Sequence, residues 1–488
     1  MFGKKIIVTL AVFILAGGAL LARQNLKQHK FFREKNSVLH QKNGFDPAVL
    51  AIEKGDTVNF LAGDGVSFWP ATDLHPLHNV YPEFDSEKPI EKWGFTFNRA
   101  GVWEYHDHLR PYLRGEIIVA GEKKTETLDP CQNQENQNIS LYVPCWVKRA
   151  EEAFAQGGLN QAFLELSSLY SEYPEFRSLC HDMTHLLGSV AYREFSQKNN
   201  LIPSARSSFC GYGFYHGFIE SLLADKKSLE EGRIFCNTLT QDRNTQEKVQ
   251  FSNSVYSCYH GLGHGTFDTL DGMLWSDEKK MTERALAACK GLPEEEERIK
   301  QCATGVFNAL ANAYLGGDYK LKFKTDDPLW ICRKQEQFSK YCYTEVAVAY
   351  IRDHRLDYGK AAELINSIGS EDGASGAVIG YIADEARMRI KNINLEDFAL
   401  KCNSLAKHLK NPCIEGVLIA LLGWSTPGKE YESLLSFCRF PAFGAEAQDF
   451  CFSYFLPRLG TIYSKEKADE ICGSIIEEKY KKYCVTIK

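Results

Sequence analysis

The placement of the cysteines is the feature that most constrains how this chain can fold. Sixteen cysteines occur among 488 residues, and none of them precedes Cys131. A large, even number of cysteines is typical of a protein that folds in an oxidising compartment, where they form disulfides. The chain therefore divides into a cysteine-free N-terminal part and a cysteine-rich remainder.

The cysteines of the second part follow one another in close pairs. The first cysteine of a pair tends to end an amphipathic segment, and the second opens the next one. A bridge between the end of one helix and the start of the next meets the short distance that a disulfide needs. Thiolate metal sites are the alternative, but no C-x-x-C spacing occurs in the chain. We predict eight local disulfides, which join Cys131 with Cys145, Cys180 with Cys210, Cys236 with Cys258, Cys289 with Cys302, Cys332 with Cys342, Cys402 with Cys413, Cys438 with Cys451, and Cys472 with Cys484.

The cysteine pairs also mark a repeat. From Cys258 to Cys484, the second cysteines of successive pairs lie 33 to 44 residues apart, except for one interval of 71 residues. This period is the signature of stacked two-helix repeats, and the long interval has room for a repeat without cysteines around residues 358–388. We predict a multidomain protein in which residues 145–488 form an all-α, solenoid-like helical-repeat domain. The surface of such a stack offers a site for a protein partner.

The N-terminal part differs in composition. Residues 36–121 contain short runs rich in Val, Ile, Phe and Trp, broken by Gly, Pro and Asp, which predicts an all-β sandwich. The polar residues 122–144 are interpreted as a linker.

Within residues 1–30, an uncharged run at 6–22 is flanked by basic residues. We expect this run to be a membrane anchor that places the rest of the chain on the periplasmic or extracellular side. A cleaved signal peptide, which would make the protein secreted, and a buried helix are the alternatives.

Four histidines stand at two places in the predicted sandwich. His75 and His78 lie in the segment H-P-L-H-N-V, and His106 and His108 lie in Y-H-D-H. Side chains two apart on a strand point to the same face, and imidazole suits copper, zinc and nickel. These four histidines are therefore predicted metal ligands, to which Asp107 and Glu83 could add an oxygen. The alternative is that they are surface or core residues of a domain without metal.

Residues 38–121 resemble the cupredoxin family. The resemblance is carried by A-I-E-K-G-D-T-V at 51–58, L-H-N-V at 77–80, G-V-W-E-Y-H-D-H at 101–108 and L-R-G-E-I-I-V at 113–119. It implies a Greek-key sandwich with His78 as the first copper ligand and further ligands in the order Cys, His, Met. His108 matches the His, His106 (or less well Tyr105) falls near the Cys place, and Leu113 falls at the Met place. Because the thiolate is missing, the resemblance implies a non-blue, imidazole-rich copper site, with zinc as the alternative metal.

A second group of histidines lies in the first helical repeats. His216 and His264 each follow a cysteine by six residues, each precedes a glycine, and each is followed four residues later by Glu220 or Asp268. Pairs of His and carboxylate on facing helices are a common way to build metal sites in helical proteins. The alternative is that Gly and His here serve close helix packing. The predicted second metal site comprises His181, His185, His216, Glu220, His260, His264 and Asp268.

These observations leave three classes of function. The first is an exported, membrane-anchored protein that binds and handles copper. The second is a metal-dependent enzyme that uses the helical histidines, although no motif indicates a particular reaction. The third is a binding scaffold without metal. The net charge of −6 carries no long acidic or basic block, so nothing indicates nucleic-acid binding.

Overall fold

The computed structural model describes residues 36–484, apart from residues 64, 77, 121–138, 199–206, 208, 240–251, 427 and 464. The predicted anchor at residues 6–22 lies outside this range. Of the helices in the described part, none is long and apolar enough to cross a membrane. The predicted linker also lies largely outside the described residues, but its last residues are helical, because α2 begins at Ile139. Val143 belongs to the hydrophobic core, which explains why the helix starts before the predicted boundary.

The N-terminal part contains two four-stranded mixed sheets with the strand orders β2-β1-β4-β6 and β3-β8-β7-β5. In each sheet one pair is parallel, β1 with β4 and β3 with β8. The strands are β1 (Ser37–Gln41), β2 (Gly44–Asp46), β3 (Val49–Glu53), β4 (Thr57–Ala62), β5 (Pro70–Thr72), β6 (Lys92–Thr96), β7 (Gly101–Asp107) and β8 (Arg110–Ala120).

The two sheets share one aromatic core. Phe60 of β4, in the first sheet, lies 5.4 Å from Tyr105 of β7, in the second sheet, measured between ring centroids. Phe84, in the long connection between β5 and β6, lies 5.5 Å from each of these rings. The alternation of apolar and polar residues along the strands therefore builds the all-β unit that the sequence predicts.

The rest of the described chain is mostly helical. The helices are α2 (Ile139–Glu172), α3 (Phe176–Lys198), α4 (Gly213–Lys226), α5 (Leu229–Thr238), α6 (Ser252–Asp268), α7 (Glu278–Lys290), α8 (Glu296–Gly316), α9 (Trp330–Arg333), α10 (Ser339–Asp353), α11 (Tyr358–Asn366), α12 (Glu371–Met388), α13 (Leu395–Ser404), α14 (Lys407–Trp424), α15 (Glu430–Cys438), α16 (Ala445–Phe455), α17 (Lys465–Gly473) and α18 (Glu478–Lys481), with short 3₁₀ turns η1 (Gly272–Leu274), η2 (Asp318–Lys320), η3 (Ile390–Asn392) and η4 (Leu456–Thr461).

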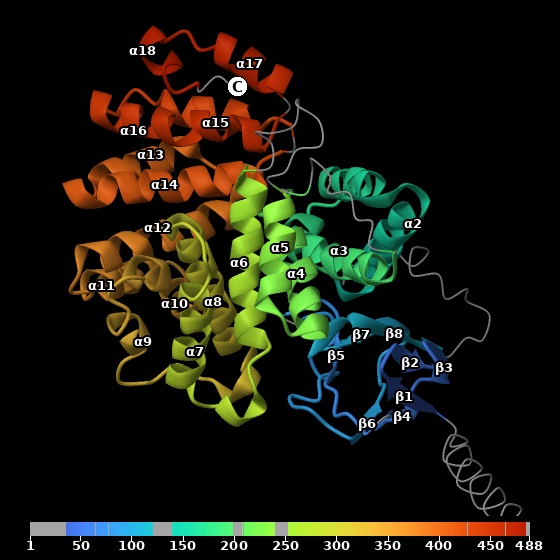
Figure 1. The fold of residues 1–488 in the computed structure, drawn as a ribbon. Coiled ribbons are helices and arrows are strands. Elements are labelled where there is room, and N and C mark those ends of the chain that lie inside the picture. The colour runs from blue at the N-terminus through green and yellow to red at the C-terminus, as the bar shows by residue number, and fades with distance from the viewer. Residues whose placement is uncertain are drawn as a thin grey trace, which may run out of the picture.

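The longer helices pack on one another in chain order, from α3 through α4, α6, α8, α10, α12 and α14 to α16 (Figure 1). The other helices flank this stack. The interval without cysteines contains a complete helix pair, α11 and α12, as the repeat length predicts. Seven of the eight predicted disulfides are present, and the eighth cannot be described because Cys131 lies outside the described residues.

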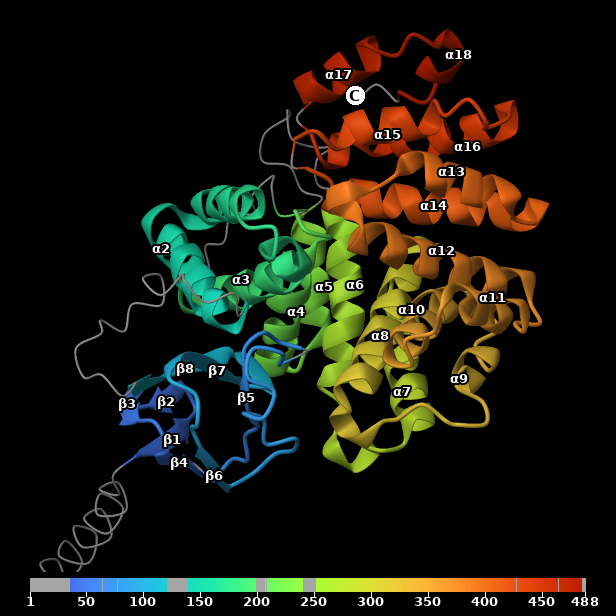
Figure 2. The same ribbon diagram turned by 180° about the vertical axis from the view of Figure 1, so that it is seen from behind.

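The β-sandwich lies against the first helices of the stack. Strands β7 and β8 contact α2, α3 and α4, and both views show the sandwich beside α3 and α4 (Figure 1 and Figure 2). Tyr112 of β8 and Tyr192 of α3 form an edge-on aromatic pair at 5.4 Å, and the hydroxyl of Tyr192 donates to Asp225 at 2.6 Å. The end of the sandwich that carries the predicted metal ligands therefore faces the helices that carry the second histidine group.

Glycines let the stacked helices come into backbone contact. A Cβ atom on Gly217 would lie 1.9 Å from the carbonyl oxygen of His185, and one on Gly305 would lie 1.9 Å from that of His260. No side chain fits at such a distance. The glycines of α4 and α8 thus fix how closely α4 approaches α3 and α8 approaches α6.

We predict that Gly305→Ala lowers the free energy of unfolding by about 1–3 kcal/mol, because α6 and α8 must move apart to admit the methyl group. Urea unfolding followed by circular dichroism measures the effect. Gly473→Ala is the matched control, because a Cβ there meets nothing within 4 Å and alanine favours a helix by up to about 1 kcal/mol. Equal stabilities of the two variants would contradict the role of Gly305 in close packing.

Candidate metal centre at the domain interface

The structure brings the four predicted histidines of the sandwich together. His75 and His78 lie in the connection that follows β5, His106 is in β7, and His108 follows the end of that strand. One ring nitrogen from each side chain lies within 4.8 Å of the others. We call these four residues the sandwich site: His75, His78, His106 and His108.

Two pairs of nitrogens in the sandwich site are in direct contact. Nδ1 of His75 lies 3.3 Å from Nε2 of His106, and Nδ1 of His108 lies 3.0 Å from Nε2 of His78. All four side chains are buried. Each contact can hold one N–H···N hydrogen bond, or it can direct two lone pairs at a common ion when neither nitrogen carries a proton.

Carboxylates orient the outer nitrogens of two of these histidines. Asp85 lies 2.7 Å from Nδ1 of His78, and Asp73 lies 3.0 Å from Nδ1 of His106. An imidazole that donates its outer N–H to a carboxylate presents the lone pair of its other nitrogen inward, which is the usual second shell of a metal site. The sequence does not single out either aspartate, because a carboxylate near a histidine is too common a pattern to indicate a partner.

Burial keeps the inner imidazoles of the sandwich site neutral. It lowers the pKa of His106 to about 4 and the pKa of His108 well below its usual value. Burial also opposes the charge of Asp73, but Arg114 and His106 outweigh it and lower the pKa of this carboxyl below its usual range. His106 and His108 are therefore held neutral beside an ionised carboxylate, which is the protonation state that metal binding requires. Burial opposes the charge of His75 as well, but Glu220 outweighs burial and raises the pKa of this imidazole.

The two predicted oxygen ligands of the sandwich lie elsewhere. Asp107 accepts hydrogen bonds from the backbone of Trp69 at 2.9 Å and from Arg110 at 2.5 Å, and Glu83 is paired with Arg99 at 2.7 Å. Tyr105 and Leu113, which the resemblance to cupredoxins aligns with the Cys and Met ligands, are part of the hydrophobic core. Strand position alone cannot reveal such competing partners. Both carboxylates are engaged by other groups, so neither is placed as the oxygen ligand that the sequence suggested.

The predicted residues of the helical domain also converge. His216 of α4 and His260 and His264 of α6 each offer one nitrogen, and the three nitrogens lie within 4.8 Å of one another. We call these three residues the helix site. Glu220, His264 and Asp268 form an overlapping group of the same compactness. His216 and His264 are buried.

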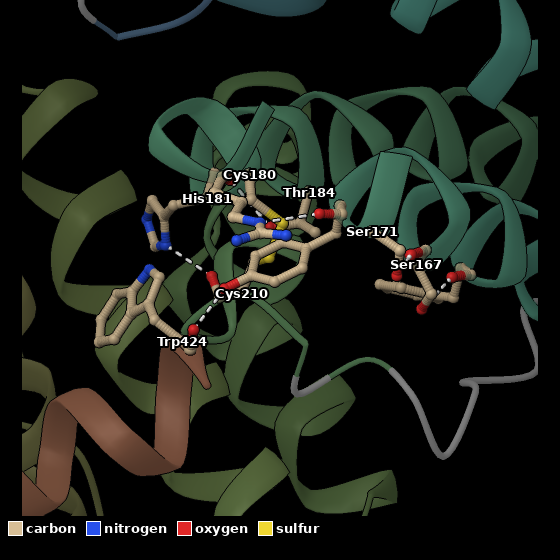
Figure 3. Close-up of a disulfide and its surroundings, with 10 residues drawn as sticks. Ser167, Ser171, Cys180, His181, Thr184, Cys210 and Trp424 are labelled. Atoms are coloured by element: carbon tan, nitrogen blue, oxygen red, sulfur yellow. Dashed lines mark hydrogen bonds between the residues drawn. A yellow bond between two sulfur atoms is a disulfide. The ribbon is translucent and has the colours of Figure 1, made fainter. Parts of the chain in front are cut away.

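The two histidines of α3 lie at the edge of this group. Nδ1 of His181 lies 3.0 Å from the carbonyl oxygen of Cys210, beside the Cys180–Cys210 disulfide (Figure 3). Its ring centroid lies 5.2 Å from that of His216. His185 places its Nε2 atom 3.3 Å from Glu220. His181 is thus positioned by the loop before α4, whereas His185 contacts Glu220 without a hydrogen bond from any described residue to either of its ring nitrogens.

Glu220 joins the two sites. Its Oε2 atom lies 3.4 Å from Nε2 of His75 in the sandwich site, and its Oε1 atom lies 3.1 Å from Nδ1 of His264 in the helix site. Burial raises the pKa of this carboxyl, but the surrounding imidazoles outweigh that effect and hold it well below its usual range. The sequence predicts both histidine groups, but it does not predict that one carboxylate touches both.

The connection after α8 closes the interface on one side. Tyr319, in η2, donates a hydrogen bond to Asp268 at 3.1 Å and lies 6.3 Å from the ring of His108. Trp275 lies 5.2 Å from Tyr319 and 6.1 Å from Trp69. These aromatic residues are not part of the sequence-predicted site, because only the tertiary fold brings them to it.

The chain was compared with protein-family models, with curated proteins and with solved structures, and none of the three comparisons found a match. The functional argument therefore depends on the chemistry of the interface.

We predict that Asp73→Asn lowers the free energy of unfolding by about 3 kcal/mol, because Arg114 and Asp73 form a buried ion pair. Urea unfolding monitored by tryptophan fluorescence measures this loss. Glu83→Gln is the matched control, because it removes the exposed Arg99 pair, which contributes about 1 kcal/mol or less. A loss for Asp73→Asn no larger than for the control would show that the buried pair is dispensable.

Proposed function

We propose that this protein is an exported metal-binding protein whose sandwich site holds one transition-metal ion on four imidazoles. The observation that carries the proposal is the convergence of four buried histidines whose nitrogens lie within 4.8 Å of one another. Proteins seldom bury so many imidazoles at one point unless a ligand satisfies them.

The nitrogen separations support this assignment. In a tetrahedral site with metal–nitrogen bonds of about 2.0–2.1 Å, neighbouring nitrogens lie about 3.3 Å apart. The two closest pairs in the sandwich site lie 3.0 and 3.3 Å apart. Only small movements of the side chains are therefore needed to place all four nitrogens around one ion.

The ligand set favours copper, with zinc as the alternative. Imidazole binds both metals, and among divalent first-row metals copper has the highest affinity for a given nitrogen site. The resemblance to cupredoxins, with His78 and His108 at ligand places, supports copper as well. No sulfur ligand is expected, because Leu113 stands at the Met place and no free cysteine occurs among the described residues. The bound copper would consequently lack the intense blue colour of a thiolate site.

The proposed role is capture and handling of the ion rather than catalysis on it. Four protein ligands fill a tetrahedral coordination sphere, whereas a catalytic site keeps one position open. The seven described disulfides support an oxidising compartment. Attachment to a membrane through residues 6–22 remains part of the proposal.

We predict that the double variant His78→Gln/His108→Gln binds one metal ion fewer per chain than the wild type. The full chain is stripped with a chelator, exposed separately to copper and to zinc, and dialysed; metal is then counted by mass spectrometry. Copper-loaded wild type should give an electron paramagnetic resonance spectrum of nitrogen-ligated Cu(II) and no intense blue band.

The control is His408→Gln, which changes an exposed histidine of α14 and should leave the metal count unchanged. Circular dichroism checks that each variant is folded. A folded double variant that retains the full metal count would refute the sandwich site.

A further inference from the structure

The helix site consists of three imidazoles stacked in the interior of the helical domain. The ring centroids of His216 and His260 lie 4.7 Å apart, and those of His216 and His264 lie 5.0 Å apart. His260 and His264 are one turn apart on α6, so both side chains project from one face of that helix towards α4. A Cβ atom on Gly261 of α6 would lie 2.9 Å from the carbonyl oxygen of Tyr215 in α4, so this glycine lets the two helices lie close together.

Two buried nitrogens of the helix site have no hydrogen-bond partner among the described residues. They are Nδ1 of His216 and Nε2 of His264, on side chains that are 6% and 3% exposed. A buried polar atom without a partner costs about 1–3 kcal/mol. If these histidines served only helix packing, their nitrogens would be expected to meet carbonyls or carboxylates, as Nδ1 of His181 does.

The hydrogen bonding of His264 determines which nitrogen is free to bind. Nδ1 of His264 faces Oε1 of Glu220 at 3.1 Å, so the neutral imidazole carries its proton on Nδ1 and directs it at this oxygen. The lone pair of His264 is therefore on Nε2, the atom without a partner. A histidine that donates one N–H to a carboxylate and presents its other nitrogen to neighbouring imidazoles has the arrangement of a metal ligand with its second shell.

From these observations we propose that His216, His260 and His264 bind a second transition-metal ion, and that Glu220 links it to the ion of the sandwich site. Three imidazoles without sulfur suit Zn²⁺ or Cu²⁺. Unlike the sandwich site, this site supplies only three nitrogens and leaves a coordination position open.

Glu220 links the sites by fixing one tautomer in each. Nε2 of His75 faces Oε2 of Glu220 at 3.4 Å, which favours the tautomer with the proton on Nε2. Its Nδ1 atom is then free to face the sandwich site, where it lies 3.3 Å from His106. The same carboxylate thus orients His75 for one ion and His264 for the other. This linkage rests on the proposed function, whereas the second site itself does not.

The second site is tested by counting ions in the full chain. Wild type, His260→Gln, and His78→Gln/His108→Gln are each loaded separately with zinc and with copper, dialysed and analysed by mass spectrometry. We expect two ions per wild-type chain and one in each variant. The exposed His354 provides the control variant His354→Gln, which should keep both ions. Circular dichroism and thermal unfolding establish that the variants are folded.

The outcomes separate the two proposals. One ion in the wild type, lost only in His78→Gln/His108→Gln, overturns the second site. One ion lost only in His260→Gln supports the helix site and overturns the sandwich site. A wild type that binds no ion overturns both. If His260→Gln does not fold, His216→Asn replaces it in the same assay.

The linkage is tested with Glu220→Gln. A glutamine has one carbonyl oxygen and so cannot accept protons from both His75 and His264. We expect the metal affinity of at least one site to fall about 10- to 100-fold, as is typical when a second-shell residue is lost. Competition titration against a chelator of known affinity measures this. Glu283→Gln, on the exposed face of α7, is the control. Affinities at both sites that match those of the control would overturn the role of Glu220.

Discussion

The interface between the two parts of the molecule is organised around one buried negative charge. Glu220 contacts His75 from the sandwich, His185 from α3 and His264 from α6. An isolated charged carboxylate in a protein interior is strongly unfavourable. The carboxylate stays ionised only where neighbouring groups donate hydrogen bonds to it, and otherwise it takes up a proton. Separating the sandwich from the helices removes one of these partners. The docking of the two parts and the charge state of the interface therefore depend on each other.

The glycines that follow histidines in the sequence explain how so many imidazoles reach this charge. A Cβ atom on Gly217 would lie 1.9 Å from the carbonyl oxygen of His185, and one on Gly261 would lie 2.9 Å from that of Tyr215, so these glycines bring α4 against α3 and α6 against α4. Packing and metal binding are thus not competing explanations of the His-Gly pattern. The glycine lets two helices approach closely, and the side chain of the adjacent histidine can then reach the neighbouring helix.

The local features of this molecule could be predicted from the sequence, and the features that join distant segments could not. The strands, the helix pairs and the close cysteine pairs depend on residues near one another in the chain. The same holds for His75 and His78, and for His106 and His108, which a two-sheet unit brings to one end. The contact between His75 and Glu220 depends on how two separate parts dock, and no periodicity records that. Asp107 is a local feature that misled the prediction. Its place between two predicted ligands suggested that it was a ligand as well, but Arg110 and the backbone of Trp69 already donate hydrogen bonds to it.

If the sandwich site binds an ion, metal affinity and docking are thermodynamically linked. All four of its imidazoles come from the sandwich, but the outer nitrogen of His75 finds its carboxylate on α4. In a sandwich released from the helices, His75 would have to find another acceptor, and its ring would be less well oriented for the ion. The coupling between two equilibria is reciprocal. If docking raises the metal affinity by a given factor, bound metal raises the equilibrium constant for docking by the same factor. An ion held in the sandwich site therefore stabilises the closed interface, and opening the interface weakens the hold on the ion.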